Sequence, residues 1–371
     1  MRRVLLPVMG LVATAMATAM LIACGASGGS PEDYPERPIN VTVGWSAGGS
    51  SDLPNRALAR EMEEESGGAV QVTNVEGATG GVAANQVAQA EPDGYNVFAG
   101  ASVLGTYLVL DQAQVGWEDY YPFLFSQTPT TIYVQEDSPY ETLEDLVDDL
   151  EENPGSLQFG TPGPGSNGEI LARILFDIAG LPEDVAEHVP YGGGSEAGQF
   201  LVSGEVDFIS VTLSDTIDFA RSGEIRPLGN LIEGDQEIEG VEFPSLLNDY
   251  PDLEDYTAIN PWYVMYLPRE TEPEIVERFS EIFLAATASE EFRRTIEEDF
   301  ASVYAPTVGQ EADEIMSQVG SARSWPLYEF GVAPNSPEEF GIPRIEEWSW
   351  PPNERAQEAE PWPEGVQASV N

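Results

Sequence analysis

The feature that most constrains the fold is a repeated order of strand, Gly-rich loop and helix. Ile39 to Trp45 has the pattern of a short buried strand, the loop Ser46 to Ser51 follows it, and Asp52 to Glu65 has the apolar spacing of a helix. We predict further strands at Val70 to Val75, Asn96 to Ala99, Thr131 to Val134, Leu157 to Gly160, His188 to Pro190, Val206 to Ser210, Arg226 to Leu231 and Trp262 to Leu267. Further helices are predicted up to Ala90, and at Leu143 to Glu152, Glu169 to Ala179 and Pro273 to Ala288. Because this alternation places helices on both faces of mostly parallel sheets, the sequence predicts an α/β fold.

The Gly-rich loops are the strongest indication of function. Each joins the carboxyl end of a strand to the start of a helix, where unpaired N–H groups and the positive end of the helix dipole face a crevice. Glycine lets the backbone approach a ligand, and Ser or Thr adds hydroxyl donors. Any one such loop is more often a plain turn of an α/β fold. Four of them in one chain favour an anion-binding cleft built from neutral dipoles.

The charge balance is the second constraint. The 371 residues carry 65 acidic and 15 basic side chains, a formal net charge of −50, and every basic residue is Arg. The acids occur in every segment, which is typical of a halophile's protein surface, because molar salt shortens the Debye length to ~3 Å and screens the repulsion. The alternative is an acidic surface for a basic partner. The sign of the charge excludes nucleic acid.

The first residues have the pattern of a lipoprotein signal. Two arginines precede an apolar stretch that ends at Cys24, the only cysteine of the chain. We predict a signal peptide at 1–23, lipid attachment at Cys24 outside the cytoplasm, and a tether at 24–33. A transmembrane anchor is the alternative interpretation. The two arginines also resemble a twin-arginine export signal, which leaves the export route open.

One motif offers an enzymatic alternative. Gly44 to Gly48 matches the G-x-S-x-G nucleophile elbow, in which Ser46 would be the nucleophile. The only histidine, His188, would be its base, with Asp93 or Asp137 as the acid. An elbow belongs to a strand in the middle of a sheet, whereas Ser46 follows the first strand of the mature chain. A secreted serine hydrolase therefore remains the second hypothesis.

Two further kinds of site are disfavoured. Gly163 to Gly168 is a literal G-x-G-x-x-G, but a proline inside it spoils the tight turn, and a dinucleotide would be lacking outside the cytoplasm. One Cys and one His cannot form a zinc cluster, and the acids do not have calcium-loop spacing. We expect no cofactor and no metal.

Seven segments together resemble the solute-binding proteins of tripartite tricarboxylate transporters, the Bug group of receptors. The matching segments are Tyr34 to Ile39, Ser46 to Asp52 with Arg56, Asn74 with Gly77 to Gly81, Glu91 to Tyr95, Phe159 to Ser166, Val189 to Gly193 and Gly204 to Asp207. They keep the family's order along the chain.

The resemblance implies a two-lobed, Venus-flytrap binding protein with crossing hinge strands. One lobe would comprise 34–131 and 257–323, and the other 132–256. The segment 324–371 would be an extension rich in Trp and Pro. Such a receptor would hold a small organic carboxylate and deliver it to the membrane subunits of its transporter. An envelope adhesion or structural lipoprotein, the third class, would not need ligand loops.

The resemblance also implies the ligand site. The family has His where this chain has Glu169 and Lys where it has Gly192, and both differences remove potential positive charge, which disfavours a citrate-like ligand. The residues expected to line the cleft are Ser46, Ala47, Gly48, Gly49, Ser50, Asp52, Gly80, Ala101, Ser102, Thr161, Gly163, Gly165, Ser166, Tyr191, Gly192 and Asp207.

Overall fold

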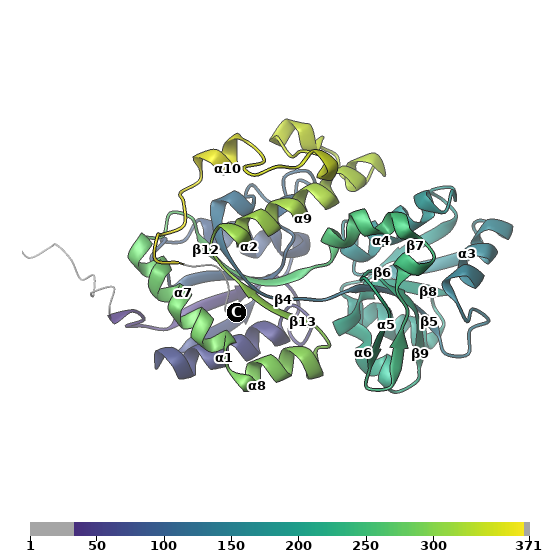
Figure 1. Cartoon of the computed structure of the whole chain (residues 1–371), viewed down its shortest axis with the longest axis horizontal. Helices are drawn as coiled ribbons and strands as arrows, with labels where there is room; N and C mark the ends of the chain where they lie inside the picture. The colour runs from purple at the N-terminus through teal and green to yellow at the C-terminus, as the bar shows by residue number, and fades with distance from the viewer. Residues whose placement is uncertain (1–32, 367–371) are drawn as a thin grey trace, which may run out of the picture.

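The computed structural model describes residues 33–366, which form two lobes beside each other (Figure 1). The predicted signal peptide, Cys24 and all of the tether except Asp33 lie outside the described residues. None of the helices within 33–366 combines the length and the apolar character needed to cross a membrane.

The first lobe is built on a six-stranded sheet. Its strands, in spatial order, are β13 (Val303–Thr307), β4 (Tyr120–Gln127), β12 (Trp262–Pro268), β3 (Asn96–Ala101), β1 (Ile39–Val43) and β2 (Val70–Asn74). β1 pairs in parallel with both β2 and β3, whereas β12 is antiparallel to its two neighbours, and β13 is antiparallel to β4.

Helices cover both faces of this sheet (Figure 1). One face packs against α1 (Leu53–Ser66), α7 (Pro273–Thr287) and α8 (Glu290–Arg294), and the other against α2 (Gly81–Ala88) and α9 (Gln310–Glu329). Leu58, Phe279 and Phe292 belong to the first apolar layer, and Phe98 and Met316 to the second. Both layers exclude water, so they hold the ends of the strands in fixed positions.

The second lobe repeats the plan with a five-stranded sheet. Its strands are β7 (Ala186–Pro190), β6 (Leu157–Thr161), β8 (Phe208–Thr212), β5 (Thr130–Gln135) and β9 (Ile225–Asn230) in spatial order. Only β5 runs against the other four. One face packs against α3 (Leu143–Glu152) and α4 (Asn167–Ile178), and the other against α5 (Gly194–Ser203) and α6 (Leu213–Arg221). A hairpin of β10 (Gln236–Ile238) and β11 (Val241–Phe243) completes the lobe. The prediction of mostly parallel α/β sheets is confirmed.

Two crossing segments connect the lobes, and they are hydrogen-bonded to each other. The chain passes from β4 to β5 at 128–129 and returns between β9 and β12. The amide of Thr128 donates to the carbonyl of Pro261 at 3.1 Å, and the amide of Thr130 donates to Oδ1 of Asn260 at 2.9 Å. The side-chain amide of Asn260 donates in turn to the carbonyl of Leu231 at 2.6 Å. This buried asparagine therefore ties the two crossings together.

Helix α9 connects the crossing to the first lobe through Arg323. The guanidinium is 1% exposed and donates to the carbonyl oxygens of Ser102 and Ile259. Burial lowers the pKa of Arg323 to about 10. Because α9 continues to Glu329, the predicted border at 323/324 falls inside a helix.

The segment 330–366 forms a strap beyond α9 (Figure 1). Apolar residues of 330–345 pack against the cluster that contains the core of the second lobe, and those of 350–366 pack along the first lobe. It includes α10 (Glu354–Glu358). The ring of Trp362 meets that of Tyr121 edge-on at 5.0 Å, and Arg355 forms a 2.8 Å ion pair with Asp119. The tryptophans of this segment thus contribute to the packing of the lobe.

Candidate functional site

A cavity of about 420 Å³ lies between the two lobes. The first lobe contributes the loop Trp45 to Ser51, together with Glu76, Thr79, Ala101, Val103 and Tyr263. The second lobe contributes Pro162, Ser166, Asn167, the loop Gly192 to Glu196, Thr212 and Asp215, and Pro261 comes from the crossing segment. The cavity is thus formed by loops that follow strand ends in both sheets, which is where α/β folds place ligands.

Three helices of the second lobe begin at this cavity. Their N-cap residues are Ser166 for α4, Gly193 for α5 and Thr212 for α6, and each N-cap, or the residue after it, lines the space. The partial positive charges of the three helix dipoles therefore point toward the cavity. Each of these helices also has an acidic residue in its first turn, which offsets part of that positive charge.

The loop of the first lobe is shaped by Asp52, the N-cap residue of α1. Its Oδ2 accepts from the amide of Gly48 and from Nε of Arg56, both at 2.8 Å, and its Oδ1 accepts from Nδ2 of Asn74 at 2.8 Å. Burial by itself raises the pKa of Asp52, but hydrogen bonds from Arg56, Gly48 and Asn74 outweigh it and hold the pKa below its usual value. Asp52 therefore orders the loop and leaves no side-chain oxygen free for a ligand.

The corresponding loop of the second lobe is shaped by Glu169, which is 2% exposed. Its Oε2 accepts from the amide of Gly165 at 2.8 Å, and its Oε1 pairs with Arg173 at 2.8 Å. This glutamate occupies the position where the family resemblance predicts a histidine near the ligand. Here it is a buried carboxylate, and it accepts the hydrogen bond of the Gly165 amide, which is then not free for a ligand.

Asp215 brings a carboxylate to the wall of the cavity from the first turn of α6. Its Oδ2 accepts a hydrogen bond from Oγ1 of Thr212. Burial raises the pKa of Asp215 above its usual value, although hydrogen bonds from Thr212 and Ser50 favour the charged form. Beside it, Oγ of Ser214 lies 2.6 Å from the hydroxyl of Tyr263, so α6 also contacts β12 of the other lobe.

The structure brings half of the sixteen predicted ligand residues to the cavity. Ser46, Ala47, Gly48, Gly49, Ser50, Ala101, Ser166 and Gly192 line it. The other eight are Asp52, Gly80, Ser102, Thr161, Gly163, Gly165, Tyr191 and Asp207, which lie outside the lining.

Several of these eight support the site from behind. Gly80 lies under the indole of Trp45, Ser102 bonds the backbone of β12 on both its amide and its hydroxyl, and the ring of Tyr191 stacks on Phe200 at 4.5 Å. Thr161 is fully buried, and its hydroxyl lies 2.7 Å from Nε2 of His188. These predicted residues therefore pack behind the residues that line the cavity.

Two placements contradict the prediction directly. Asp207 precedes β8, at the end of the strand away from the cavity, and its carboxylate accepts from the amide of Gln158 at 2.8 Å. Gly165 has φ of 77°, and a Cβ there would lie 2.8 Å from Cδ1 of Leu110 in the first lobe. The close approach at Gly165 is therefore to the protein itself, and Gly163, just before it in the same turn, is also in the left-handed region with φ of 111°.

Some lining residues were not predicted from the sequence. They are Trp45, Glu76, Thr79, Val103, Asn167 and those at the starts of α5 and α6. The segment Thr212 to Asp215 follows a predicted strand, and that position was the available signal, but it contains no glycine. Pro261 and Tyr263 belong to the crossing, and their place in the site follows only from the two-lobed fold.

The structure does not bring together the Ser46 and His188 side chains that the hydrolase hypothesis requires. Ser46 lies in the first lobe, whereas His188 lies on β7 of the second. The ring nitrogens of His188 face Thr161 at 2.7 Å and Glu169 at 3.4 Å. Burial lowers the pKa of His188, although Glu169 acts in the opposite direction. The expected Ser–His pair is absent from residues 33–366. The same residues contain no cluster of three His, Cys, Asp or Glu side chains with the geometry of a metal site.

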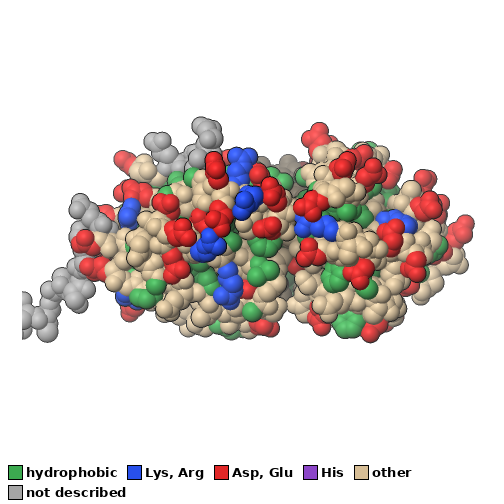
Figure 2. All heavy atoms as spheres, turned by 90° about the horizontal axis from the view of Figure 1, so that it is seen from below, with side chains coloured by type: hydrophobic (Ala, Val, Ile, Leu, Met, Phe, Trp, Pro, Cys, Tyr) green, Lys and Arg blue, Asp and Glu red, His purple; other side chains and the backbone are tan. Residues whose placement is uncertain are grey.

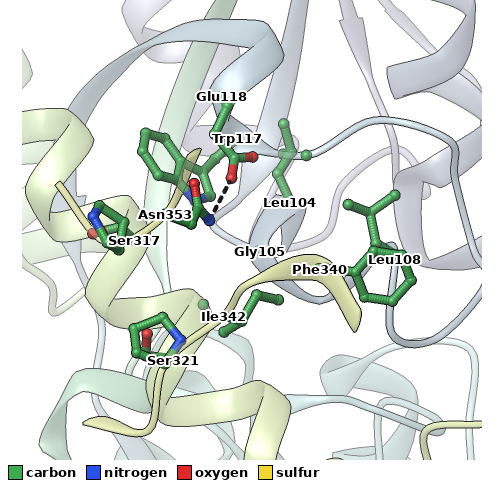
Figure 3. Close-up of a pocket in the computed structure, with 14 residues that line it drawn as sticks. Leu104, Gly105, Leu108, Trp117, Glu118, Ser317, Ser321, Phe340, Ile342 and Asn353 are labelled. Atoms are coloured by element: carbon green, nitrogen blue, oxygen red, sulfur yellow. Dashed lines mark hydrogen bonds between the residues drawn. The ribbon is translucent and has the colours of Figure 1, made fainter. Parts of the chain in front are cut away.

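A second, smaller hollow of about 20 Å³ lies under the strap (Figure 3). Its walls come from the segment 104–118, from α9 and from the strap, and Nδ2 of Asn353 donates to Oε1 of Glu118 at 3.2 Å. It has room for about one water molecule, and we assign it to the packing of the strap.

Comparisons with known proteins identify the family. The sequence profile of the tripartite tricarboxylate transporter family receptor, TctC, matches residues 55–327, well over half of the chain. The chain belongs to this receptor family. BugT of Bordetella pertussis is 25% identical over 79% of this chain and 91% of its own length. The family consists of solute-binding receptors, as the resemblance predicted.

Solved structures agree on the fold of this receptor. The periplasmic binding protein BugD superposes with a TM-score of 0.70 at 23% identity, covering 81% of this chain and 99% of BugD. An R. palustris protein solved with adipate has a TM-score of 0.73 at 22% identity, covering 81% of this chain and all of the other. The two-lobed periplasmic-binding-protein fold is confirmed.

Proposed function

We propose that this receptor captures a small organic carboxylate in the cavity between its lobes and presents it to the membrane subunits of a tripartite tricarboxylate transporter. The observation that carries the proposal is the loop Trp45 to Ser51 on the cavity wall, where the amides of Ser46, Ala47 and Ser51 have no hydrogen-bond partner among residues 33–366. The structural neighbour solved with adipate adds support. The eight predicted residues that line the cavity are the proposed contacts.

Replacing Gly49 by Val is the sharpest test of this site. A Cβ at Gly49 has ordinary contacts, the nearest being the carbonyl oxygen of Ser46 at 3.5 Å, so the fold tolerates it. The added methyl groups then occupy the cavity and block the loop amides. Each lost charge-assisted hydrogen bond costs ~1.5–3 kcal/mol, or about one to two decades of affinity. Calorimetry with a panel of mono-, di-, tri- and aminocarboxylates in molar salt provides the measurement.

Three further variants make the result specific. Gln71→Val introduces the same side chain at an exposed position of β2, outside the cavity, and should leave affinity unchanged. Ser46→Ala should weaken binding modestly, and a hydrolytic turnover lost in that variant would favour the enzyme hypothesis instead. Gly165→Val should lower the melting temperature, because the residue is in the left-handed region and faces Leu110. Unchanged affinity in Gly49→Val, or no binding by any acid of the panel, contradicts the proposal.

The proposal also covers the membrane anchor, the salt environment and the lobe borders. We infer lipid attachment at Cys24, with 24–33 as a tether, from the sequence pattern. A halophilic habitat is inferred from the charge balance, and Figure 2 shows acidic side chains spread over both lobes of one face. The predicted lobe borders at 131/132 and 256/257 stay proposals, and the crossings at 128–129 and 231–261 lie beside the first and around the second.

A further inference from the structure

The side chains around the cavity carry only negative charge. Glu76 enters from the first lobe, and Glu196 and Asp215 enter from the second, whereas no Arg, Lys or His lines the space. Glu76 and Glu196 are exposed, so solvent screens their charges, whereas the carboxylate of Asp215 lies in the wall, where burial reduces the screening but also raises its pKa. A ligand with two carboxylates would place the second against these acids with nothing to neutralise it.

The N-termini of α4, α5 and α6 do not supply the missing positive charge, because each helix has an acidic residue in its first turn. Glu169, Glu196 and Asp215 all occupy the third position of their helices. Glu196 accepts from the amide of Gly192 at 2.7 Å, and Glu169 accepts from that of Gly165 at 2.8 Å. A carboxylate in the first turn cancels much of the dipole's attraction for an external anion. The wall of the second lobe is therefore poor at holding a carboxylate.

The loop of the first lobe retains free donors. Among residues 33–366, the amides of Ser46, Ala47 and Ser51 have no hydrogen-bond partner, although the neighbouring amide of Gly48 is used by Asp52. Successive free amides in a turn form a concave anion site. One carboxylate of the ligand fits here, and its other end then faces the acidic wall.

An aromatic surface completes the cavity. The indole of Trp45 lines it and is held flat by its neighbours: a Cβ on Gly100 would lie 1.9 Å from the indole, and Phe98 stacks on it at 6.3 Å. The ring of Tyr263 also lines the space. Aromatic faces beside carboxylates, without a competing base, recognise cationic nitrogen groups.

We propose that the ligand is a zwitterion, with one carboxylate on the loop of the first lobe and a positively charged nitrogen between Trp45 and the carboxylates of Asp215, Glu76 and Glu196. This inference rests on the proposed function and specifies its ligand class. At equal chain length, exchanging the ligand's second carboxylate for an ammonium group turns repulsion from these acids into attraction. We expect a gain of about 10- to 100-fold in affinity.

Matched pairs of acids test the inference. Succinate and β-alanine, glutarate and γ-aminobutyrate, and adipate and δ-aminovalerate each share a methylene chain and differ only in the charge of one end. Calorimetry in molar potassium chloride, with tryptophan fluorescence as a second readout, should show the aminocarboxylate binding at least tenfold more tightly in one or more pairs. Asp215→Asn and Glu76→Gln should each reduce that ratio. Glu205→Gln, an exposed acid of the second lobe outside the cavity, is the control and should leave the ratio unchanged.

The outcomes separate the two proposals. A dicarboxylate that binds as tightly as its partner or more tightly overturns the zwitterion and leaves a carboxylate receptor standing. A preference for the aminocarboxylate that persists in both Asp215→Asn and Glu76→Gln overturns the assignment of the acidic wall. Failure of every acid in both series overturns the zwitterion together with the proposed function. If Asp215→Asn does not fold, the exposed Glu76→Gln still decides the assignment.

Discussion

The contact that fastens the strap to the first lobe gives the strongest prediction about stability. Arg269 and Asp313 form a two-pronged ion pair with distances of 2.7 and 3.2 Å, and both side chains are more than nine-tenths buried. Asp313 also accepts from Nε1 of Trp362 at 2.9 Å, and Arg269 donates to the carbonyl of Glu360 at 3.2 Å. The guanidinium lies over the ring of Tyr121 at 4.4 Å. The pair therefore connects β12, α9 and the strap.

We expect Arg269→Met to destabilise the protein strongly, because it leaves the buried carboxylate of Asp313 without its counter-charge. Breaking one side of such a pair costs about 3–5 kcal/mol. At about 2–4 °C per kcal/mol for a unit of 150–250 residues, the melting temperature should fall by roughly 6–20 °C. The double variant Arg269→Met/Asp313→Leu removes both charges and should recover more than half of that loss.

Thermal melts of the wild type, both single variants and the double variant, followed by near-ultraviolet circular dichroism in molar salt, complete a double-mutant cycle. Arg293→Met is the matched control, because its ion pair with Glu297 is largely exposed and should contribute about 0–1 kcal/mol. A loss below about 1 kcal/mol in Arg269→Met would refute the reasoning. So would a double variant whose loss equals the sum of the single losses.

Three further predictions concern charge and location. With 65 acids against 15 arginines, the folded state should lose stability below a few tenths molar salt, where screening extends over ~10 Å; melts across a salt series measure this, and a salt-independent melting temperature contradicts it. Because folding lowers the pKa of Asp52, its contribution to stability is present at neutral pH and is lost as pH falls through the pKa of the folded state. The difference in melting temperature between wild type and Asp52→Asn should therefore shrink in acid, and a difference that stays constant contradicts this prediction. Cys24→Ala should release the protein into the medium or leave an uncleaved precursor, and an unchanged, lipid-free membrane fraction on fractionation excludes the tether.

The local pattern of the chain determined most of its secondary structure. The helix predicted at Leu143 to Glu152 has those bounds in the structure, since its apolar side faces one core and Thr142 caps it with a hydrogen bond from the amide of Asp145. The predicted strand at Val70 agrees to within one residue. Such signals are short-range, because strand alternation, helical spacing and caps depend on neighbours in the sequence.

Elements stabilised by distant contacts escaped the sequence analysis. β4 was not predicted, because Tyr120 to Gln127 is apolar on both faces without alternation and contains Pro122, which argues against a central strand. It is a strand because β12 and β13 pair with its two edges. α9 was missed because Pro326 interrupts its pattern, although both lobes pack against it.

The sequence by itself determined that this chain has strand-end loops suited to an anion, a large excess of negative charge and the segment order of a receptor family. Only the tertiary structure decided which loop residues face the ligand cavity. Gly165 and Gly49 look alike in the sequence, yet Gly165 packs on Leu110, whereas Gly49 lines the cavity. The physical reason is that a backbone N–H is available to a ligand only if no closer acceptor of the protein takes it. That competition is settled by carboxylates such as Glu169 and Asp52, whose positions depend on how the helices dock on the sheets.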